Sequence, residues 1–355
     1  MKCKQAFMHG PFDLRIEEVE LPELKDDQIL IKLGACGICG SDVECFEGKS
    51  KEGRYDIAPY TPGHEWAGKA VAVGKSVTSV KPGNKVVGEC SLACGSCANC
   101  KDGKQPSSCL NWREVGFRPD SPGGMGEYMI LEERYTHTIP DDWSYELGAW
   151  VETFNVGYGG VRYNGCYPDA ADTVAIIGGG PIGLSACMTC AESGATVIVI
   201  DPIPARRENA LKYGADIVLD PSASPIEEQV RAVTEGRGAD VVIEASGNDI
   251  GIASLFDISA ESAKIGVIGH SIGRKVPVEI GKTIWKNLQI KGVAGPKNWF
   301  PRTIRFMSMI KDKYDFAALN THHFAFEDID AAFDMAANHK DIARKVMLTF
   351  PGMDD

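Results

Sequence analysis

The sequence predicts an α/β protein of two domains, one β-rich and one with a doubly wound parallel sheet. The chain has 355 residues, more than one hydrophobic core usually holds, and 44% of them are apolar, enough for two cores. Its first 150 residues carry short β-type runs broken by glycine and proline. From about Asp172 apolar strands alternate with helical stretches, and this change of pattern predicts the second domain.

The β-type runs of the first part span residues 29–33, 70–73, 85–88 and 128–131 and predict antiparallel strands. The second part reads strand 174–178, helix 181–193, strand 196–201, helix 206–213 and strands 216–220, 240–246 and 264–269. Repeated β-α units of this kind build a parallel sheet covered by helices. Beyond about Gly292 the pattern is mixed, and residues 326–337 have the periodicity of an amphipathic helix.

Composition and charge exclude several classes of partner. The formal net charge is −12 and there is no strong basic run, so we expect no binding to nucleic acid or anionic membranes. The first residues lack the apolar core of a signal peptide, and glycines interrupt the uncharged stretch 173–191. We therefore expect a cytoplasmic protein without a membrane span, in which the twelve cysteines are ligands, nucleophiles or buried thiols.

A glycine-rich segment follows the first strand of the β-α region and fits the pattern G-x-G-x-x-G. Such glycines allow a tight turn, close approach of a pyrophosphate and packing of a helix whose N-terminus faces the anion. Asp201 ends the next strand, where a carboxylate accepts hydrogen bonds from a ribose and repels a 2′-phosphate, which favours NAD over NADP. The expected cofactor-binding residues are Gly178, Gly180, Pro181, Ile182, Gly183, Asp201 and Arg206. Arg206 and Arg207 could reach a 2′-phosphate, although solvated positions on a helix are the simpler interpretation.

Four cysteines form the pattern C-x2-C-x2-C-x8-C: Cys94, Cys97, Cys100 and Cys109. Four thiolates at short spacing close a tetrahedral shell around zinc, and a shell without an open position is structural rather than catalytic. A zinc ribbon that binds DNA is the other reading of this spacing, and the acidic balance of the chain argues against it.

A second group of candidate ligands has an open shell. Cys39 precedes Gly40-Ser41-Asp42, and His64 and Glu65 follow in the segment PGHEWAG. A thiolate, an imidazole and a carboxylate can hold zinc and leave a position for water or substrate. Each residue alone also fits an ordinary structural role, as a packed thiol, a core histidine or a surface glutamate. The local sequence therefore does not decide whether these residues bind a metal.

Several motifs together resemble the medium-chain alcohol dehydrogenase superfamily over nearly the whole chain. The segment GHEWAG, followed by Gly74 and Val77, resembles the zinc signature of that family, and GICGSD resembles its first zinc-ligand segment. The four-cysteine lobe, KPGNKVVGE, GGMGEYM and GGGPIG follow in the same order. The triplet 151–153 and the segments 295–307 and 322–333 look most like the sorbitol and threonine dehydrogenase branch.

The resemblance implies a GroES-like β-rich catalytic domain at residues 1–153 and 293–355 and a Rossmann NAD-binding domain at 154–292. It implies two zinc ions per chain, a structural one on the cysteine quartet and a catalytic one on Cys39 and His64. Glu152 falls at the position of the third ligand or of a water-activating acid, and Glu65 stands beside the metal. The resemblance also implies NAD as the cofactor and assembly as a homodimer or homotetramer.

Ser41 matches the hydroxyl that takes the alcohol proton in this family. Glu44 stands where many relatives have the histidine that passes the proton on, so the relay is altered. Either Glu44 takes over this role, or the proton leaves through zinc-bound water and the carboxylate of Glu65 or Glu152. Cys36 and Cys45 match no ligand position, and we interpret them as packing thiols. The last cysteine spacing also departs from the family, because Cys100 and Cys109 enclose eight residues instead of the usual seven.

The branch resemblance implies reversible oxidation of a secondary alcohol to a ketone, with polyols, sugar alcohols or inositol-like rings first. A threonine-type substrate is the alternative, and a bulky alcohol such as a steroid becomes one if several aromatic residues face the cleft. The rival from another class is a non-catalytic nucleotide-binding or zinc-binding structural protein. The joint presence of Cys39, His64, Glu65 and Glu152 argues against that rival.

Overall fold

The computed structural model describes residues 1–49, 58–163, 165–269, 275–293 and 299–353. The chain divides into two compact units, which we call unit 1 (Met1–Glu152 with Phe300–Asp355) and unit 2 (Thr153–Trp299). Part of one family-like segment, residues 295–298, lies outside the described residues. Among the described residues, no helix is both long and apolar enough to cross a bilayer.

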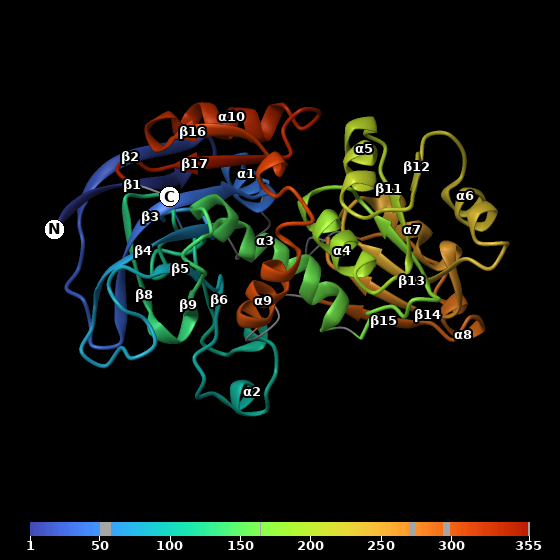
Figure 1. The fold of residues 1–355 in the computed structure, drawn as a ribbon, viewed down its shortest axis with the longest axis horizontal. Helices are drawn as coiled ribbons and strands as arrows, with labels where there is room; N and C mark the ends of the chain where they lie inside the picture. Colours follow the sequence, from blue (N-terminus) through green and yellow to red (C-terminus); the bar gives the residue numbers. More distant parts are fainter. Residues whose placement is uncertain (50–57, 164, 270–274, 294–298, 354–355) are drawn as a thin grey trace. The chain divides into compact units, whose positions relative to one another are not determined.

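Unit 1 is built mainly from antiparallel strands (Figure 1). Its large sheet has seven strands in the order β16-β17-β3-β4-β5-β9, and β8 also pairs with β3; β1 with β2 and β6 with β7 form two small sheets. The strands are β1 (Lys2–Gly10), β2 (Asp13–Glu20), β3 (Gln28–Ile38), β4 (Glu65–Val73), β5 (Lys85–Gly88), β6 (Ser91–Leu92), β7 (Arg113–Glu114), β8 (Tyr128–Glu132), β9 (Thr136–Thr138), β16 (Asn320–Ala325) and β17 (Lys345–Thr349). The four predicted β runs lie in β3, β4, β5 and β8, which confirms them.

The helices of unit 1 are short, and they are α1 (Gly40–Phe46), α2 (Ala98–Lys101), α9 (Phe300–Ile310) and α10 (Ile329–Asn338). Turns of 3₁₀ helix occur at Pro106–Ser108, Glu133–Tyr135, Ala317–Leu319 and Phe326–Asp328. The last of these leads into α10, so the predicted amphipathic helix at 326–337 is confirmed with a 3₁₀ first turn. Phe333 of α10 is fully buried in the core of unit 1 together with Ile29, Ile31 and Leu33 of β3.

Unit 2 contains the predicted parallel sheet, with six strands in the order β12-β11-β10-β13-β14-β15. In chain order this is third, second, first, fourth, fifth, sixth, which is the Rossmann arrangement. The strands are β10 (Thr173–Ile177), β11 (Thr196–Ile200), β12 (Ile217–Leu219), β13 (Ala239–Glu244), β14 (Ser259–Val267) and β15 (Gln289–Gly292). The helices are α4 (Pro181–Ala191), α5 (Pro204–Lys212), α6 (Ile226–Val233), α7 (Asp249–Ile258) and α8 (Gly281–Trp285).

The longest helix, α3 (Tyr145–Arg162), was not predicted and contains the boundary between the two units. Ser144 caps its first turn, because the Ser144 hydroxyl accepts a hydrogen bond from the Leu147 amide at 3.1 Å. This helix was not predicted because it contains several glycines, which have a low helix propensity. Gly148 is needed for packing, because a Cβ there would press on Ile139 and Ala67.

Candidate metal and nucleotide sites

Three distant chain segments meet at the carboxyl end of β3. The pairing of β3 with β4 sets Gly37 opposite Glu65, and the pairing of β3 with β17 sets Ile38 opposite Val346. Cys39 directly follows this end of β3, and His64 directly precedes β4. The strand register therefore brings together the two segments that the sequence analysis selected and adds the start of β17.

The donor atoms of Cys39, His64 and Glu65 lie within 4.8 Å of one another, close enough to share one metal ion. The His64 and Glu65 residues are only 5% and 2% exposed. His64 Nδ1 is buried without a hydrogen-bond partner, and the carboxylate oxygen Asp42 Oδ1 lies 3.6 Å away. A buried imidazole nitrogen with an open lone pair, a thiol and a carboxylate fit a zinc ion with one open position.

Charges around this group favour a bound cation. Burial alone would lower the pKa of His64, but Asp42 and Cys39 outweigh it and raise that pKa well above the usual value of 6.5. The same anions that favour an imidazolium also favour a metal cation. Glu152 of α3 lies outside the group of three, and burial raises its pKa to about 7, with His64 and Glu65 among the charges that act on it.

Helix α1 orients the remaining predicted residues of this site. Its first turn is held by Asp42, whose Oδ2 accepts a hydrogen bond from the Cys39 amide at 2.9 Å. Ser41 is half-buried and Glu44 is exposed on this helix. Cys36 and Cys45 are buried, in keeping with packing thiols, and none of the twelve cysteines, all of them in the described residues, forms a disulfide.

Lys345 is a site residue that the sequence analysis missed. Its Nζ donates to both carboxylate oxygens of Glu65, at 2.8 and 2.6 Å, and both side chains are buried. Burial lowers the pKa of Lys345, but the charges of Glu65 and Cys39 raise it by a larger amount. The net shift of the pKa is therefore upward, and the ammonium stays charged. Only the register of β17 against β3 reveals this lysine, because a single charge at a strand start carries no sequence signal.

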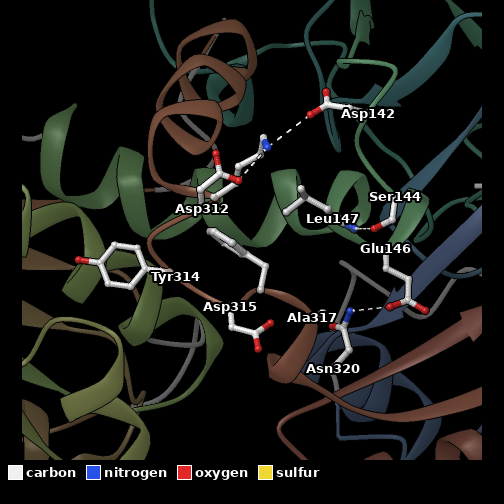
Figure 2. A pocket seen from close by; sticks show the side chains of 11 residues that line it. Asp142, Ser144, Glu146, Leu147, Asp312, Tyr314, Asp315, Ala317 and Asn320 are labelled. Atoms are coloured by element: carbon white, nitrogen blue, oxygen red, sulfur yellow. Dashed lines mark hydrogen bonds and ion pairs between the residues drawn. The ribbon is translucent and has the colours of Figure 1, made fainter.

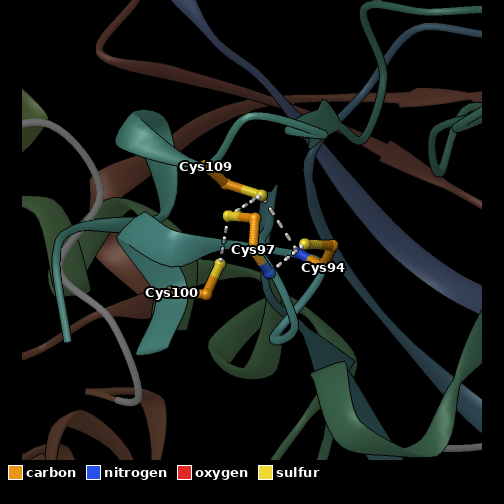
Figure 3. Close-up of side chains that lie close together, drawn as sticks. All are labelled: Cys94, Cys97, Cys100 and Cys109. Carbon is orange, nitrogen blue, oxygen red and sulfur yellow. Dashed lines mark hydrogen bonds between the residues drawn. The ribbon is translucent and has the colours of Figure 1, made fainter. Parts of the chain in front are cut away.

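The four cysteines of the predicted structural site also lie together (Figure 3), with all four sulfurs within 4.8 Å of one another. Cys97 Sγ is 3.4 Å from Cys100 Sγ and 3.9 Å from Cys109 Sγ. A hydrogen bond from the Ser96 hydroxyl, together with backbone amides, lowers the pKa of Cys94 to about 5, which prepares one thiolate. The longer spacing before Cys109 is taken up by the 3₁₀ turn Pro106–Ser108. Among the residues that the structure describes, no histidine or carboxylate joins these four thiols as a potential ligand, and four thiols fit a closed zinc shell.

The glycine segment of unit 2 forms the predicted turn between β10 and α4. Gly178 has φ 102°, a conformation that favours glycine, and a Cβ on Gly183 would collide with the Gly178 carbonyl. A Cβ on Gly180 would meet nothing within 4 Å, so the turn leaves open space for a pyrophosphate in front of Pro181 and Ile182 of α4. The order of the strands reverses at β10, which is where open α/β sheets bind nucleotides.

Asp201 is buried at the end of β11 and helps to shape this turn. Its carboxylate accepts hydrogen bonds from the amides of Gly179 and Ile203, each at 2.8 Å. The Arg206 guanidinium lies 3.6 Å from Asp201 Oδ2. Arg207 is half-buried rather than fully solvated, and it donates to the Asp201 carbonyl at 2.7 Å and pairs with Asp220 at 2.9 Å.

Unit 1 also holds a separate cavity of about 310 Å³ that contains none of the predicted site residues (Figure 2). Four acidic side chains line it, from Asp142, Glu146, Asp312 and Asp315. Lys311 pairs with Asp142 at 3.3 Å and with Asp312 at 3.0 Å, so part of this charge is neutralised within the wall.

Known proteins similar to this chain cover nearly its whole length. The chain matches the model of the alcohol dehydrogenase GroES-like domain over residues 25–141 and that of the zinc-binding dehydrogenase over 181–309. It is 31% identical to a sorbitol dehydrogenase of Bacillus subtilis (strain 168), over 97% of this chain and 96% of the relative. It is 30% identical to an L-threonine 3-dehydrogenase of Rhizobium johnstonii, over 90% of this chain and 91% of the relative.

Among solved structures, a protein of Escherichia coli CFT073 described as a short chain alcohol dehydrogenase complexed with NADH is similar, with a TM-score of 0.88. It is 28% identical, and the alignment covers 98% of this chain and 99% of that one. The fold and these relatives define a two-domain zinc-type dehydrogenase with GroES-like and Rossmann parts. The chain belongs to the zinc-dependent medium-chain alcohol dehydrogenase superfamily, and it is an enzyme of that class.

Proposed function

We propose that the enzyme oxidises a secondary alcohol reversibly to a ketone with NAD, with a polyol, sugar alcohol or inositol-like ring as substrate. The observation that carries this proposal is the convergence of Cys39, His64 and Glu65 within 4.8 Å in a buried setting. In the proposal, unit 1 supplies the catalytic residues and unit 2 binds the dinucleotide.

The catalytic zinc would be held by Cys39 and His64, with Glu152 or Glu65 as the third ligand. When bound, zinc supplies Lewis acidity, which lowers the pKa of the substrate hydroxyl and prepares the carbon for hydride transfer to NAD. The second zinc of the proposal belongs to Cys94, Cys97, Cys100 and Cys109, and it would stabilise its lobe without taking part in the reaction.

The protein's own residues orient the substrate and move its proton. Ser41 lies two residues after Cys39 on α1, half-buried, and would accept the hydroxyl proton. Glu44 is exposed on the same helix and would pass the proton to solvent. Phe117 packs its ring 4.9 Å from the His64 ring and helps to keep water from the imidazole.

The cofactor would bind at the turn of Gly178, Gly180 and Gly183, with the pyrophosphate at the N-terminus of α4. Asp201 supports NAD over NADP, because its carboxylate repels a ribose 2′-phosphate. Arg206 lies beside that carboxylate and would contact the adenosine ribose.

A threonine-type substrate is the second candidate, supported by the similarity to the L-threonine 3-dehydrogenase. The two candidates differ in charge, since an amino acid needs partners for an ammonium and a carboxylate whereas a polyol needs neutral hydrogen-bonding groups. Turnover of polyols, inositols, threonine and steroid alcohols, measured as NAD reduction, separates them.

Metal analysis of the wild type and of Cys39→Ser tests the proposal directly. We expect about two zinc ions per chain, falling to about one in Cys39→Ser with loss of turnover. Cys45→Ser, a packed thiol on the same helix α1, is the matched control and should keep both ions and the activity. One zinc ion per chain, unchanged by Cys39→Ser, would contradict the catalytic site.

We also propose a cytoplasmic homodimer or homotetramer. Free thiols at all twelve cysteines support a reducing compartment. The edge strand β15 is exposed at every residue, and next to it Trp285 of α8 is 87% exposed and Ile284 is 86% exposed. Pairing of this edge with the same edge of a second copy would cover these side chains, and light scattering of the purified enzyme measures the assembly.

A further inference from the structure

Glu65 does not face the metal-binding pair alone, because a buried ammonium holds its other side. Lys345 Nζ lies 2.8 Å from Glu65 Oε1 and 2.6 Å from Glu65 Oε2, so it contacts both oxygens of the carboxylate. The side chains are 5% and 2% exposed, so water screens neither charge. A buried pair of this kind is costly to break on one side only, since the remaining charge is left uncompensated.

Three neighbouring strands of the sheet hold Glu65 and Lys345 in contact. Glu65 begins β4, Lys345 begins β17, and Gly37 of β3 lies between the two strands. A Cβ on Gly37 would collide with Glu65 Oε2 and would lie 3.4 Å from Lys345 Cδ. The absence of a side chain at Gly37 therefore makes the room in which the carboxylate and the ammonium meet.

Lys345 is also held on its far side. Its Nζ lies 5.5 Å from the centre of the Trp150 ring, a cation–π contact. The Trp150 indole N–H donates to Asn320 Oδ1 at 2.7 Å. The Asn320 amide in turn donates to Glu146 at 3.1 Å, a hydrogen bond drawn in Figure 2. Trp150 and Glu146 lie one turn apart on α3, the helix that also carries Glu152.

We propose that Lys345 is a positioning residue that keeps Glu65 as a neutralised neighbour of the metal at Cys39 and His64, rather than a permanent ligand. This proposal rests on the proposed function only in assuming that a metal binds Cys39 and His64. The ammonium cancels the charge of Glu65, so the carboxylate competes weakly for the dication, and one coordination position stays open for substrate. Glu152 is then the carboxylate available as the third ligand.

Removal of the ammonium reverses this balance. In Lys345→Met the buried Glu65 carboxylate loses the ammonium that contacts both of its oxygens, and Coulomb attraction draws it toward the dication. We expect release of the catalytic zinc to a chelator to slow by about tenfold or more, because the net charge around the ion is more negative by one. We also expect the visible spectrum of the cobalt-substituted protein to change, and kcat to fall more than KM rises. Lys345→Arg should restore the wild-type release rate in large part.

Three controls make the experiment decisive. The zinc at the four cysteines should be released at the wild-type rate in every variant. Lys85→Met removes another lysine of unit 1, which donates to the Trp143 carbonyl at 2.6 Å, and should not change release of the catalytic zinc. In a Glu65→Gln background, Lys345→Met should have no effect on release, and this double variant remains informative if Lys345→Met alone fails to fold.

Faster zinc release or an unchanged rate in Lys345→Met would overturn the proposal, and so would an equal effect of Lys345→Met with and without Glu65→Gln. Failure of the proposed function looks different. In that case the release rates and cobalt spectra follow the expected pattern, but no alcohol in the panel is oxidised. The positioning role would then stand, and the substrate assignment would fall.

Discussion

Gly37 lies opposite Glu65 in the β3–β4 pair, and the carboxylate of Glu65 occupies the space that a side chain on Gly37 would fill. This contact joins the geometry of the sheet to the geometry of the metal site. Any residue larger than glycine at position 37 must displace the Glu65 carboxylate, which Lys345 contacts.

Substitution of Gly37 by alanine should therefore damage the site and the fold together. Overpacking of this kind costs about 1–3 kcal/mol in free energy of unfolding, and we expect Gly37→Ala to lose catalytic zinc as well. Urea unfolding and zinc analysis measure the two effects. Gly10→Ala is the control, because a Cβ at Gly10 meets nothing within 4 Å. Full zinc content in Gly37→Ala would show that the site tolerates displacement of Glu65.

Loss of one thiol from the four-cysteine group should release one metal and leave the other. We expect Cys109→Ser to contain about one zinc ion fewer per chain and to melt at a lower temperature, because a structural zinc contributes folding free energy directly. Calorimetry and elemental analysis measure this. Cys166→Ser removes a buried thiol of unit 2 and should keep the full zinc content. An unchanged zinc content in Cys109→Ser would contradict the closed shell.

Cofactor preference should depend on Asp201. Replacement by asparagine removes the negative charge at the end of β11, so we expect Asp201→Asn to raise the ratio of NADP to NAD binding by roughly tenfold. Titration of both dinucleotides against protein fluorescence gives the ratio. Asp216→Asn is the matched control, since Asp216 also accepts a backbone amide beside β11, from Val197 at 2.8 Å. An equal ratio in Asp201→Asn and the wild type would remove Asp201 from cofactor selection.

Stability at acid pH should depend on Glu133. Amides and hydroxyls of Ser79 and Thr78 donate to its carboxylate and lower its pKa to about 2, below the usual 4.5. Because the pKa of Glu133 is lower in the folded protein than in the unfolded chain, its ionised form stabilises the fold at pH values above the unfolded pKa of about 4.5. This contribution is lost as pH falls from about 4.5 through about 2.

We expect Glu133→Gln to cost about 1 kcal/mol in free energy of unfolding at pH 7, less than the roughly 1.5–3 kcal/mol usual for hydrogen bonds to a charged group, because solvent screens this carboxylate. The cost should shrink toward pH 2 in urea titrations. Glu23→Gln, at an exposed position, should show no such dependence. A cost independent of pH would mean that the shape of the side chain matters at position 133 and its charge does not.

Local patterns were sufficient to predict the parts of the fold that depend on neighbours in sequence. The alternation in β3 and the strand-glycine-helix order around Gly178 both appear in the structure where they were expected. The glycines of α3 concealed that helix, because propensity alone cannot show that Gly148 is required by packing. The resemblance selected Cys39, His64 and Glu65, and strand register explains why they are close. Register also brings in Lys345, which no short-range rule could have found.

Glu65 and Lys345 are separated by 280 residues in sequence, yet their side chains are in direct contact in the candidate metal site. Synthesis of the chain therefore supplies Cys39, His64 and Glu65 early and the lysine that contacts Glu65 almost last. Until β17 joins the sheet, the Glu65 carboxylate lacks its contact with the Lys345 ammonium, so a metal that binds then meets a different electrostatic environment. Under the proposed role of Lys345, completion of the C-terminal strand is the step that leaves one coordination position of the metal open to exchange.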